Sequence, residues 1–146
     1  MRFNRFIALG DSMTGSRLLG SDLLLLIVAG LTKKQLLDYH QLATELGMIT
    51  LVEVHSVAES EIALDIGAKI IGVNCRNLKT LEVDKNTFER ILPVLPQSVV
   101  KVAESGISTR SDVERIAQLG ANAVLVGEAL VKSGNPVHTI KDLLNL

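Results

Sequence analysis

Short apolar stretches alternate with amphipathic stretches along most of this chain. A continuous apolar run of about four to eight residues is typical of a strand buried on both faces, as in a parallel sheet. Five such runs predict strands, and a run near the start predicts a sixth: residues 23–29, 48–54, 69–73, 99–103 and 123–126, with 3–9 as the sixth.

The amphipathic stretches between these runs predict helices. Thr32 with Gln35, and Ser56 with Glu59, have the spacing of a helix-starting capping box, and Thr109 and Asp112 open a further helix. The predicted helices cover residues 32–46, 56–66, 84–92, 109–119 and 135–144, with short ones at 13–19 and 128–133.

The repeated order of strand and helix predicts an α/β fold, with a parallel sheet and right-handed crossovers. A complete barrel of eight such units typically needs about 250 residues. The 146 residues of this chain therefore predict either an open doubly wound sheet or part of a barrel. No Pro- or Ser-rich linker interrupts the pattern, which predicts a single domain over residues 1–146.

Composition narrows the class of protein. Hydrophobic residues make up 47% of the chain and the mean hydropathy is +0.34, which argues against disorder. The net charge of −1 gives no support for a nucleic-acid partner. The apolar run at 23–30 is far shorter than the roughly 20 residues that span a bilayer. We expect a cytoplasmic protein with no membrane or nucleic-acid partner.

Polar side chains gather where the predicted strands end, which is where α/β proteins place their chemistry. Glu53 lies at the end of one strand, Asn74 and Arg76 follow the next, and Glu104 follows a third. The carboxylates either act in a site or are solvated or paired with lysines. An asparagine and an arginine two residues apart either orient hydroxyls and pair an anion, or cap a loop.

Two glycine-containing pairs follow the last two strands, Ser105-Gly106 and Gly127-Glu128. A single glycine at such a place indicates a tight turn. A pair on consecutive final units predicts a phosphate site made of backbone N–H groups and a helix start, as in the last loops of many barrels. The lone Cys75 is expected to be a small buried residue. His40, His55 and His138 have no metal-ligand spacing and are predicted to be surface or cap residues.

Five stretches together resemble indole-3-glycerol phosphate synthase, a (βα)8-barrel family of tryptophan biosynthesis: LLLLIVAGL, LGMITLVEVHS, GAKIIGVNCRNLKTLEVD, VAESGIST and GANAVLVGEAL. The resemblance implies a partial (βα)8 TIM barrel of five to six parallel βα units, with residues 1–20 as a divergent segment. It also implies a carboxy-lyase that converts carboxyphenylamino-deoxyribulose phosphate to indole-glycerol phosphate by ring closure, decarboxylation and dehydration, without a cofactor.

The resemblance assigns roles to the residues at the strand ends. Glu53 matches a glutamate implicated in proton transfer, Asn74 an asparagine that contacts substrate hydroxyls, and Glu104 a glutamate that lines the pocket; these three are the catalytic positions that the resemblance implies. Cys75 stands where the family has Asn or Ser. The implied binding roles are substrate binding for Arg76 and Ser105, and phosphate binding for Ser105, Gly106, Gly127 and Glu128.

The start of the chain departs from the family. Aligned without gaps, Asn4 stands where the family has a lysine that acts as general acid, and the family's first-strand glutamate and lysine have no counterpart. Asparagine cannot donate a proton at neutral pH, and loss of a positioned acid commonly costs about 10²–10⁴ in rate. We therefore expect little or no synthase activity from a truncated, isolated chain. One function that stays open is a synthase-like lyase whose missing groups come from a partner fragment.

Three other functions stay open: a non-catalytic protein that binds phosphate ion or a phosphorylated small molecule, a structural remnant, and a hydrolase. The stretch FIALGDSMT resembles the first block of GDS-type hydrolases, in which Ser12 would be the nucleophile. The later blocks of that family are absent, and Asn135 stands where its Asp-x-x-His motif has aspartate before His138. An incomplete barrel would leave unpaired strand edges, so we also expect a homo-oligomer.

Overall fold

The computed structural model describes residues 6–8, of which the backbone alone is considered, and residues 20–146. The chain forms two compact units, one up to Ile71 and one from Gly72 onward. Each unit is described by itself. Asn4, Ser12 and the predicted helix at 13–19 lie outside the described residues.

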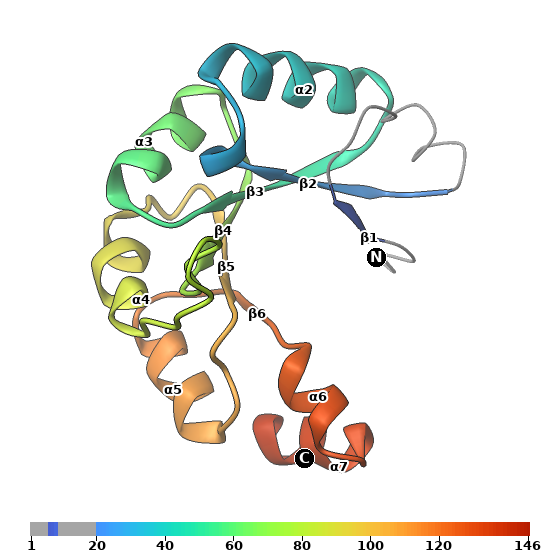
Figure 1. Cartoon of the computed structure of the whole chain (residues 1–146), viewed down its shortest axis with the longest axis vertical. Helices are drawn as coiled ribbons and strands as arrows, with labels where there is room; N and C mark the ends of the chain where they lie inside the picture. The colour runs from blue at the N-terminus through green and yellow to red at the C-terminus, as the bar shows by residue number, and fades with distance from the viewer. Residues whose placement is uncertain (1–5, 9–19) are drawn as a thin grey trace. The chain divides into compact units, whose positions relative to one another are not determined.

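The first unit consists of parallel strands connected through helices (Figure 1). Strands β1 and β3 pair in parallel with β2, one on each side, so that Leu23 lies opposite both Phe6 and Ile49. Ile27, at the end of β2, lies opposite Glu53. The elements are β1 (Phe6–Ala8), β2 (Leu23–Ile27), η1 (Val28–Gly30), α2 (Lys33–Glu45), β3 (Ile49–Val54) and α3 (Val57–Asp65).

Local sequence signals start and end these helices. The Thr32 hydroxyl accepts a hydrogen bond from the Gln35 backbone N–H, and the Gln35 side chain accepts from the Thr32 N–H at 3.0 Å, so the predicted capping box of α2 is confirmed. The capping box predicted at Ser56 and Glu59 forms only in part: the Ser56 hydroxyl accepts from the Glu59 N–H, but the Glu59 side chain accepts from the His55 N–H and not from that of Ser56. Gly47 follows α2 with a positive φ of 69°, a conformation that glycine adopts without a steric cost.

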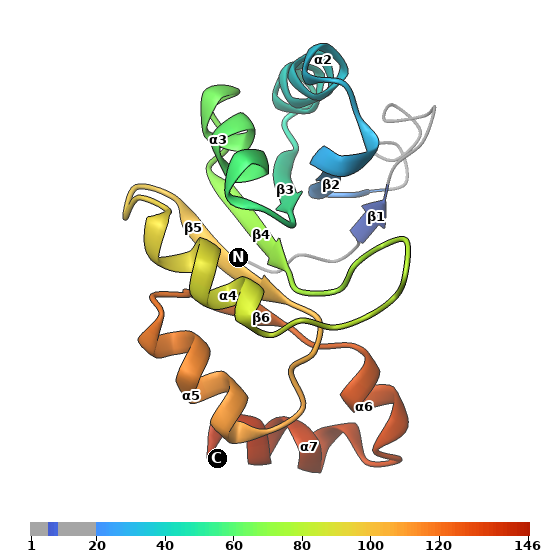
Figure 2. The ribbon, with the colours of Figure 1, turned by 60° about the vertical axis from the view of Figure 1, so that its left-hand side comes forward.

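The second unit repeats the plan (Figure 2). Strand β4 begins at the boundary and is followed by β5 and β6, and Val102 of β5 lies opposite Ala123 of the parallel β6. The elements are β4 (Ile70–Asn74), α4 (Asn86–Ile91), η2 (Leu92–Val94), β5 (Val100–Glu104), α5 (Arg110–Gln118), β6 (Ala123–Leu125), α6 (Glu128–Lys132) and α7 (Pro136–Leu144).

Consecutive residues are buried in β3 and β4, as expected for parallel strands, whereas the residues of β6 are exposed or half-buried. Both units have aliphatic cores, because helix residues such as Leu36 and Ile116 are buried along with the strands. The α/β class and the strand–helix alternation of a partial (βα)8 barrel are confirmed. No helix in residues 20–146 is both long and apolar enough to cross a bilayer.

From residue 20 on, two predicted boundaries differ from the structure by two residues, and the others by at most one. The strand at 23–29 ends at Ile27, because a single 3-10 turn, η1, replaces its last residues. The helix at 84–92 begins two residues late, because Asp84 donates its backbone N–H to the Cys75 carbonyl at 2.9 Å. Arg76 and Val83 form an antiparallel bridge, so residues 75–84 are a small hairpin.

Candidate functional site

The three predicted catalytic residues all lie at the carboxyl ends of their strands and are buried. Glu53 is in β3 of the first unit, while Asn74 and Glu104 end β4 and β5 of the second. The Cys75 backbone N–H donates to the Glu104 carbonyl at 3.2 Å, so Asn74 and Glu104 end neighbouring strands side by side. Their proposed roles in catalysis stay predictions.

Asn74 also shapes the loop that follows it. Its side-chain carbonyl Oδ1 accepts a hydrogen bond from the Arg76 backbone N–H at 2.9 Å. This is the loop-capping function that the sequence left open, and it fixes where the Arg76 side chain leaves the backbone. This hydrogen bond therefore couples the position of the Asn74 side chain to that of the Arg76 backbone.

A pocket of about 270 Å³ lies in the second unit, beyond the carboxyl ends of β5 and β6. It contains every residue that the sequence assigned to substrate or phosphate binding. Ile107, Leu125 and Val126 complete its lining with apolar surface. The assigned residues in the lining are Arg76, Ser105, Gly106, Gly127 and Glu128.

The backbone of this pocket is constrained. Ser105 and Gly106 have positive φ angles of 67° and 63°. A left-handed conformation costs a non-glycine residue about 1–2 kcal/mol, and such strain is found at ligand sites. A Cβ on Gly106 would lie 2.7 Å from Val83 Cγ1 and 2.9 Å from Cys75 Sγ, so this position has no room for a side chain.

Arg76 contributes a positive charge to the pocket wall, and two neighbouring groups hold its guanidinium in place. Arg76 Nη2 forms an ion pair with Glu128 Oε2 at 2.6 Å, and Nη1 donates to the Leu81 carbonyl at 3.2 Å. A hydrogen bond from Lys132, the charge of Lys132 and then Arg76 lower the pKa of Glu128. An anion that enters the pocket would therefore compete with the Glu128 carboxylate for the guanidinium.

The backbone N–H groups of Gly106 and Gly127 donate to no protein acceptor in the described part of the chain. Gly127 is also the residue before α6, which has five residues. Amide donors without an acceptor, next to an arginine, can bind a phosphate or another small anion.

The sequence missed His55. It was predicted to be a surface or cap residue, yet 17% of its side chain is exposed. Its ring lies 3.4 Å from Glu53 through Nε2 and 3.4 Å from Glu59 through Nδ1. The spacing of Glu53 and His55 could have indicated that the two side chains are neighbours, because residues two apart in an extended chain lie on the same side.

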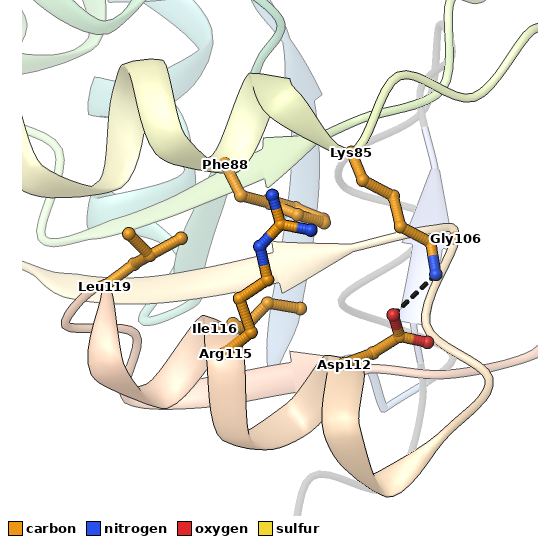
Figure 3. Close-up of a pocket in the computed structure, with 7 residues that line it drawn as sticks. All are labelled: Lys85, Phe88, Gly106, Asp112, Arg115, Ile116 and Leu119. Carbon is orange, nitrogen blue, oxygen red and sulfur yellow. Dashed lines mark hydrogen bonds and ion pairs between the residues drawn. The ribbon is translucent and has the colours of Figure 1, made fainter.

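A second, very small cavity of about 10 Å³ lies between α4 and α5 (Figure 3). Lys85 Nζ and Asp112 Oδ1 form an ion pair across it at 2.5 Å, and Phe88 and Ile116 contribute apolar surface. Burial raises the pKa of Asp112, but hydrogen bonds from Lys85 and from the amides of Ser108 and Thr109 outweigh it, so the pKa falls to about 2. This cluster has no space for a ligand and joins two helices.

No three His, Cys, Asp or Glu side chains within residues 20–146 are arranged to hold a metal ion.

Burial raises the pKa of the Cys75 thiol, as expected for a buried residue that is not a nucleophile.

The family model and the curated relatives that match this chain belong to one family. Residues 4–143 match the family model of indole-3-glycerol phosphate synthase. The indole-3-glycerol phosphate synthase of Rhodococcus jostii is 53% identical over 126 residues, which are 86% of this chain and 47% of that protein. Indole-3-glycerol phosphate synthase 1 of Streptomyces coelicolor is 49% identical over 139 residues, 95% of this chain and 52% of that protein. The chain thus spans about half the length of the curated relatives it matches.

Solved structures share the fold at low identity. Thiamine phosphate pyrophosphorylase from Pyrococcus furiosus superimposes with a TM-score of 0.73 at 16% identity, covering 96% of this chain and 65% of that one. 3-Hexulose-6-phosphate synthase from Salmonella typhimurium gives a TM-score of 0.74 at 19% identity, covering 90% of this chain and 65% of that one.

Proposed function

Since the chain belongs to the indole-3-glycerol phosphate synthase family, we propose that it provides the phosphate-binding part of a synthase site. The substrate would be carboxyphenylamino-deoxyribulose phosphate, and the reaction its ring closure, decarboxylation and dehydration in tryptophan biosynthesis. The observation that supports this proposal is the single pocket that contains all the residues assigned to phosphate and substrate binding.

In this proposal each lining group has a distinct task. The Arg76 guanidinium pairs with the phosphate, and the amides of Gly106 and Gly127 donate to its remaining oxygens. A phosphate monoester carries about −1.5 to −2 charges at neutral pH, so it can displace the Glu128 carboxylate from Arg76. Asn74 and Glu104 end the neighbouring strands, from which they contact the sugar part of the substrate.

We propose that the 146-residue polypeptide turns over little substrate by itself. Asn4 cannot replace the family's lysine as an acid, and that loss alone commonly costs about 10²–10⁴ in rate. Glu53 would transfer protons once the other catalytic groups are supplied by a second chain. A chain that binds phosphate without catalysis under any condition is the second candidate, and the same pocket supports it.

Apolar surface on the second unit supports self-association of the chain. Val137, Ile140 and Leu144 are exposed and lie on one stripe of α7, at positions i, i+3 and i+7. A groove of about 210 Å³ lies between α5, β6 and Leu144, and β6 is the last strand of the sheet in the described residues. We propose that a second copy covers this surface. Light scattering that shows a monomer at micromolar concentration would contradict it.

Calorimetric titration with inorganic phosphate, and then with a non-reactive analogue of the substrate, tests the binding proposal. We expect both to bind the wild-type chain and neither to bind Arg76→Gln measurably. Arg110→Gln is the matched control, because Arg110 is a half-exposed arginine on α5 that pairs with Glu114 and does not line the pocket. Unchanged binding by Arg76→Gln, or no binding by the wild type, would overturn the proposal.

A further inference from the structure

Glu53 is an unusual residue for the interior of the first unit. Its side chain is 5% exposed, at the end of a strand whose neighbours are apolar. A buried carboxylate normally receives hydrogen bonds, because its desolvation is otherwise costly. Oxygen Oε1 of Glu53 receives none from the described residues. What faces this oxygen is the ring of His55, with Nε2 at 3.4 Å.

The His55 ring lies between two carboxylates. Its other nitrogen, Nδ1, faces Glu59 Oε2 at 3.4 Å, and that same oxygen accepts the His55 backbone N–H at 2.7 Å. Glu59 is itself fixed at the start of α3, where its N–H donates to the Ser56 hydroxyl. In the described part of the first unit, Glu53 and Glu59 are the charged groups within 4 Å of the ring.

Three neighbouring buried polar atoms thus have no hydrogen bond from the described residues: Glu53 Oε1, His55 Nε2 and His55 Nδ1. The ring is slightly too far from each carboxylate for a hydrogen bond. Because a carboxylate only accepts, the ring can donate to Glu53 and Glu59 together only when both of its nitrogens carry a proton, and one N–H is enough for the bond to Glu53. Hydrogen bonds of catalytic groups are often long without substrate and shorten when substrate binds.

We propose that His55 is the positioning residue of Glu53: its Nε2–H donates to Glu53 Oε1 and orients the carboxylate, while Glu59 holds the ring. This inference rests on the proposed function, in which Glu53 transfers protons. Glu53 touches the substrate in that reaction, and His55 acts through Glu53. Misplacing a catalytic group by about 1 Å can cost about 10²-fold in rate. The orientation of the Glu53 carboxylate therefore matters more for the reaction rate than its burial alone.

The chain contains a matched control pair. His138 Nε2 lies 3.4 Å from Asp142 Oδ2, the same distance as His55 from Glu53, but these side chains are 71% and 63% exposed. Exposed pairs of this kind contribute little, because water competes for both groups. Any property of His55 that depends on a buried hydrogen bond should therefore be absent from His138.

The first test is ¹⁵N–¹H NMR of the histidine rings in the 146-residue chain. We expect a His55 Nε2–H signal that exchanges slowly with water, and we expect it to shift or disappear in Glu53→Gln. His138 should show no such signal, with or without Asp142→Asn. Absence of a protected His55 ring proton, or no change in Glu53→Gln, would overturn the inference, and this result does not depend on the synthase reaction.

The second test separates positioning from a merely structural role. The chain is mixed with the N-terminal half of the Rhodococcus jostii relative, and synthase turnover is measured. His55→Ala should lower kcat about 10-fold or more with KM nearly unchanged, and His55→Asn, which keeps an N–H donor, should recover most of the loss. Equal kcat for His55→Ala and wild type would overturn the inference. If the wild-type mixture is inactive, the proposed function fails, and the NMR result decides the positioning by itself.

Discussion

One added methyl group at Gly106 should have a large effect on stability. In Gly106→Ala the new Cβ would lie 2.7 Å from Val83 Cγ1 and 2.9 Å from Cys75 Sγ. Neither neighbour moves easily, because Cys75 is buried and valine has few rotamers. The backbone also keeps a φ of +63°, which alanine adopts at a cost of about 1–2 kcal/mol.

The magnitude follows from these two costs together. Overpacking of a tight site typically costs about 1–3 kcal/mol, so Gly106→Ala should lower the free energy of unfolding by about 2–5 kcal/mol. Gly134→Ala is the control, because Gly134 has a similar φ of +67° but no atom within 4 Å of a Cβ. It should cost about 1–2 kcal/mol, from the backbone alone.

Urea denaturation followed by circular dichroism measures both variants. The double variant Val83→Ala/Gly106→Ala removes the closest contact, and it should recover at least about 1 kcal/mol relative to the sum of the two single changes. Equal losses for Gly106→Ala and Gly134→Ala would refute the steric reasoning. Gly106→Ala should also bind phosphate more weakly, because Gly106 lines the pocket.

Two further outcomes are expected. Glu128→Gln should strengthen phosphate binding about two- to fivefold in a calorimetric titration, because the carboxylate no longer competes for Arg76; weaker binding would mean that Glu128 assists the anion. Asp112→Asn should lower the free energy of unfolding by about 2 kcal/mol above pH 5. Because the folded pKa of Asp112 is depressed, this difference should shrink as pH falls from about 4 to about 2, and a pH-independent difference would contradict the role of Asp112.

The strand and helix order was predictable from sequence, because apolar runs and capping residues act locally. The capping box of α2 and the strands around Glu53 and Glu104 follow from such signals.

The pocket residues were predictable for a different reason. In consecutive parallel units the carboxyl ends of strands lie at one edge, so the sequence alone predicts that Ser105 and Gly127 lie near each other.

Other features depend on contacts between distant residues and were not predictable. Nothing in the local sequence of Glu128 indicates that Arg76, 52 residues earlier, takes its carboxylate as a partner. The hairpin at 75–84 contains no Asn-Gly or Asp-Gly turn, so its antiparallel bridge left no signal. The burial of His55 depends on how α3 packs on β3, which the periodicity of either element does not contain.

The central proposal is that the 146-residue polypeptide binds the phosphorylated substrate of the family but forms little product by itself. A fluorescence assay for indole-glycerol phosphate measures it directly, with the purified 146-residue chain alone and mixed with the N-terminal half of the Rhodococcus jostii relative. We predict no product from either chain alone and product from the mixture, lost when the chain carries Glu53→Gln. Product formed at a substantial rate by the 146-residue chain alone, or no product from the mixture, would contradict the account.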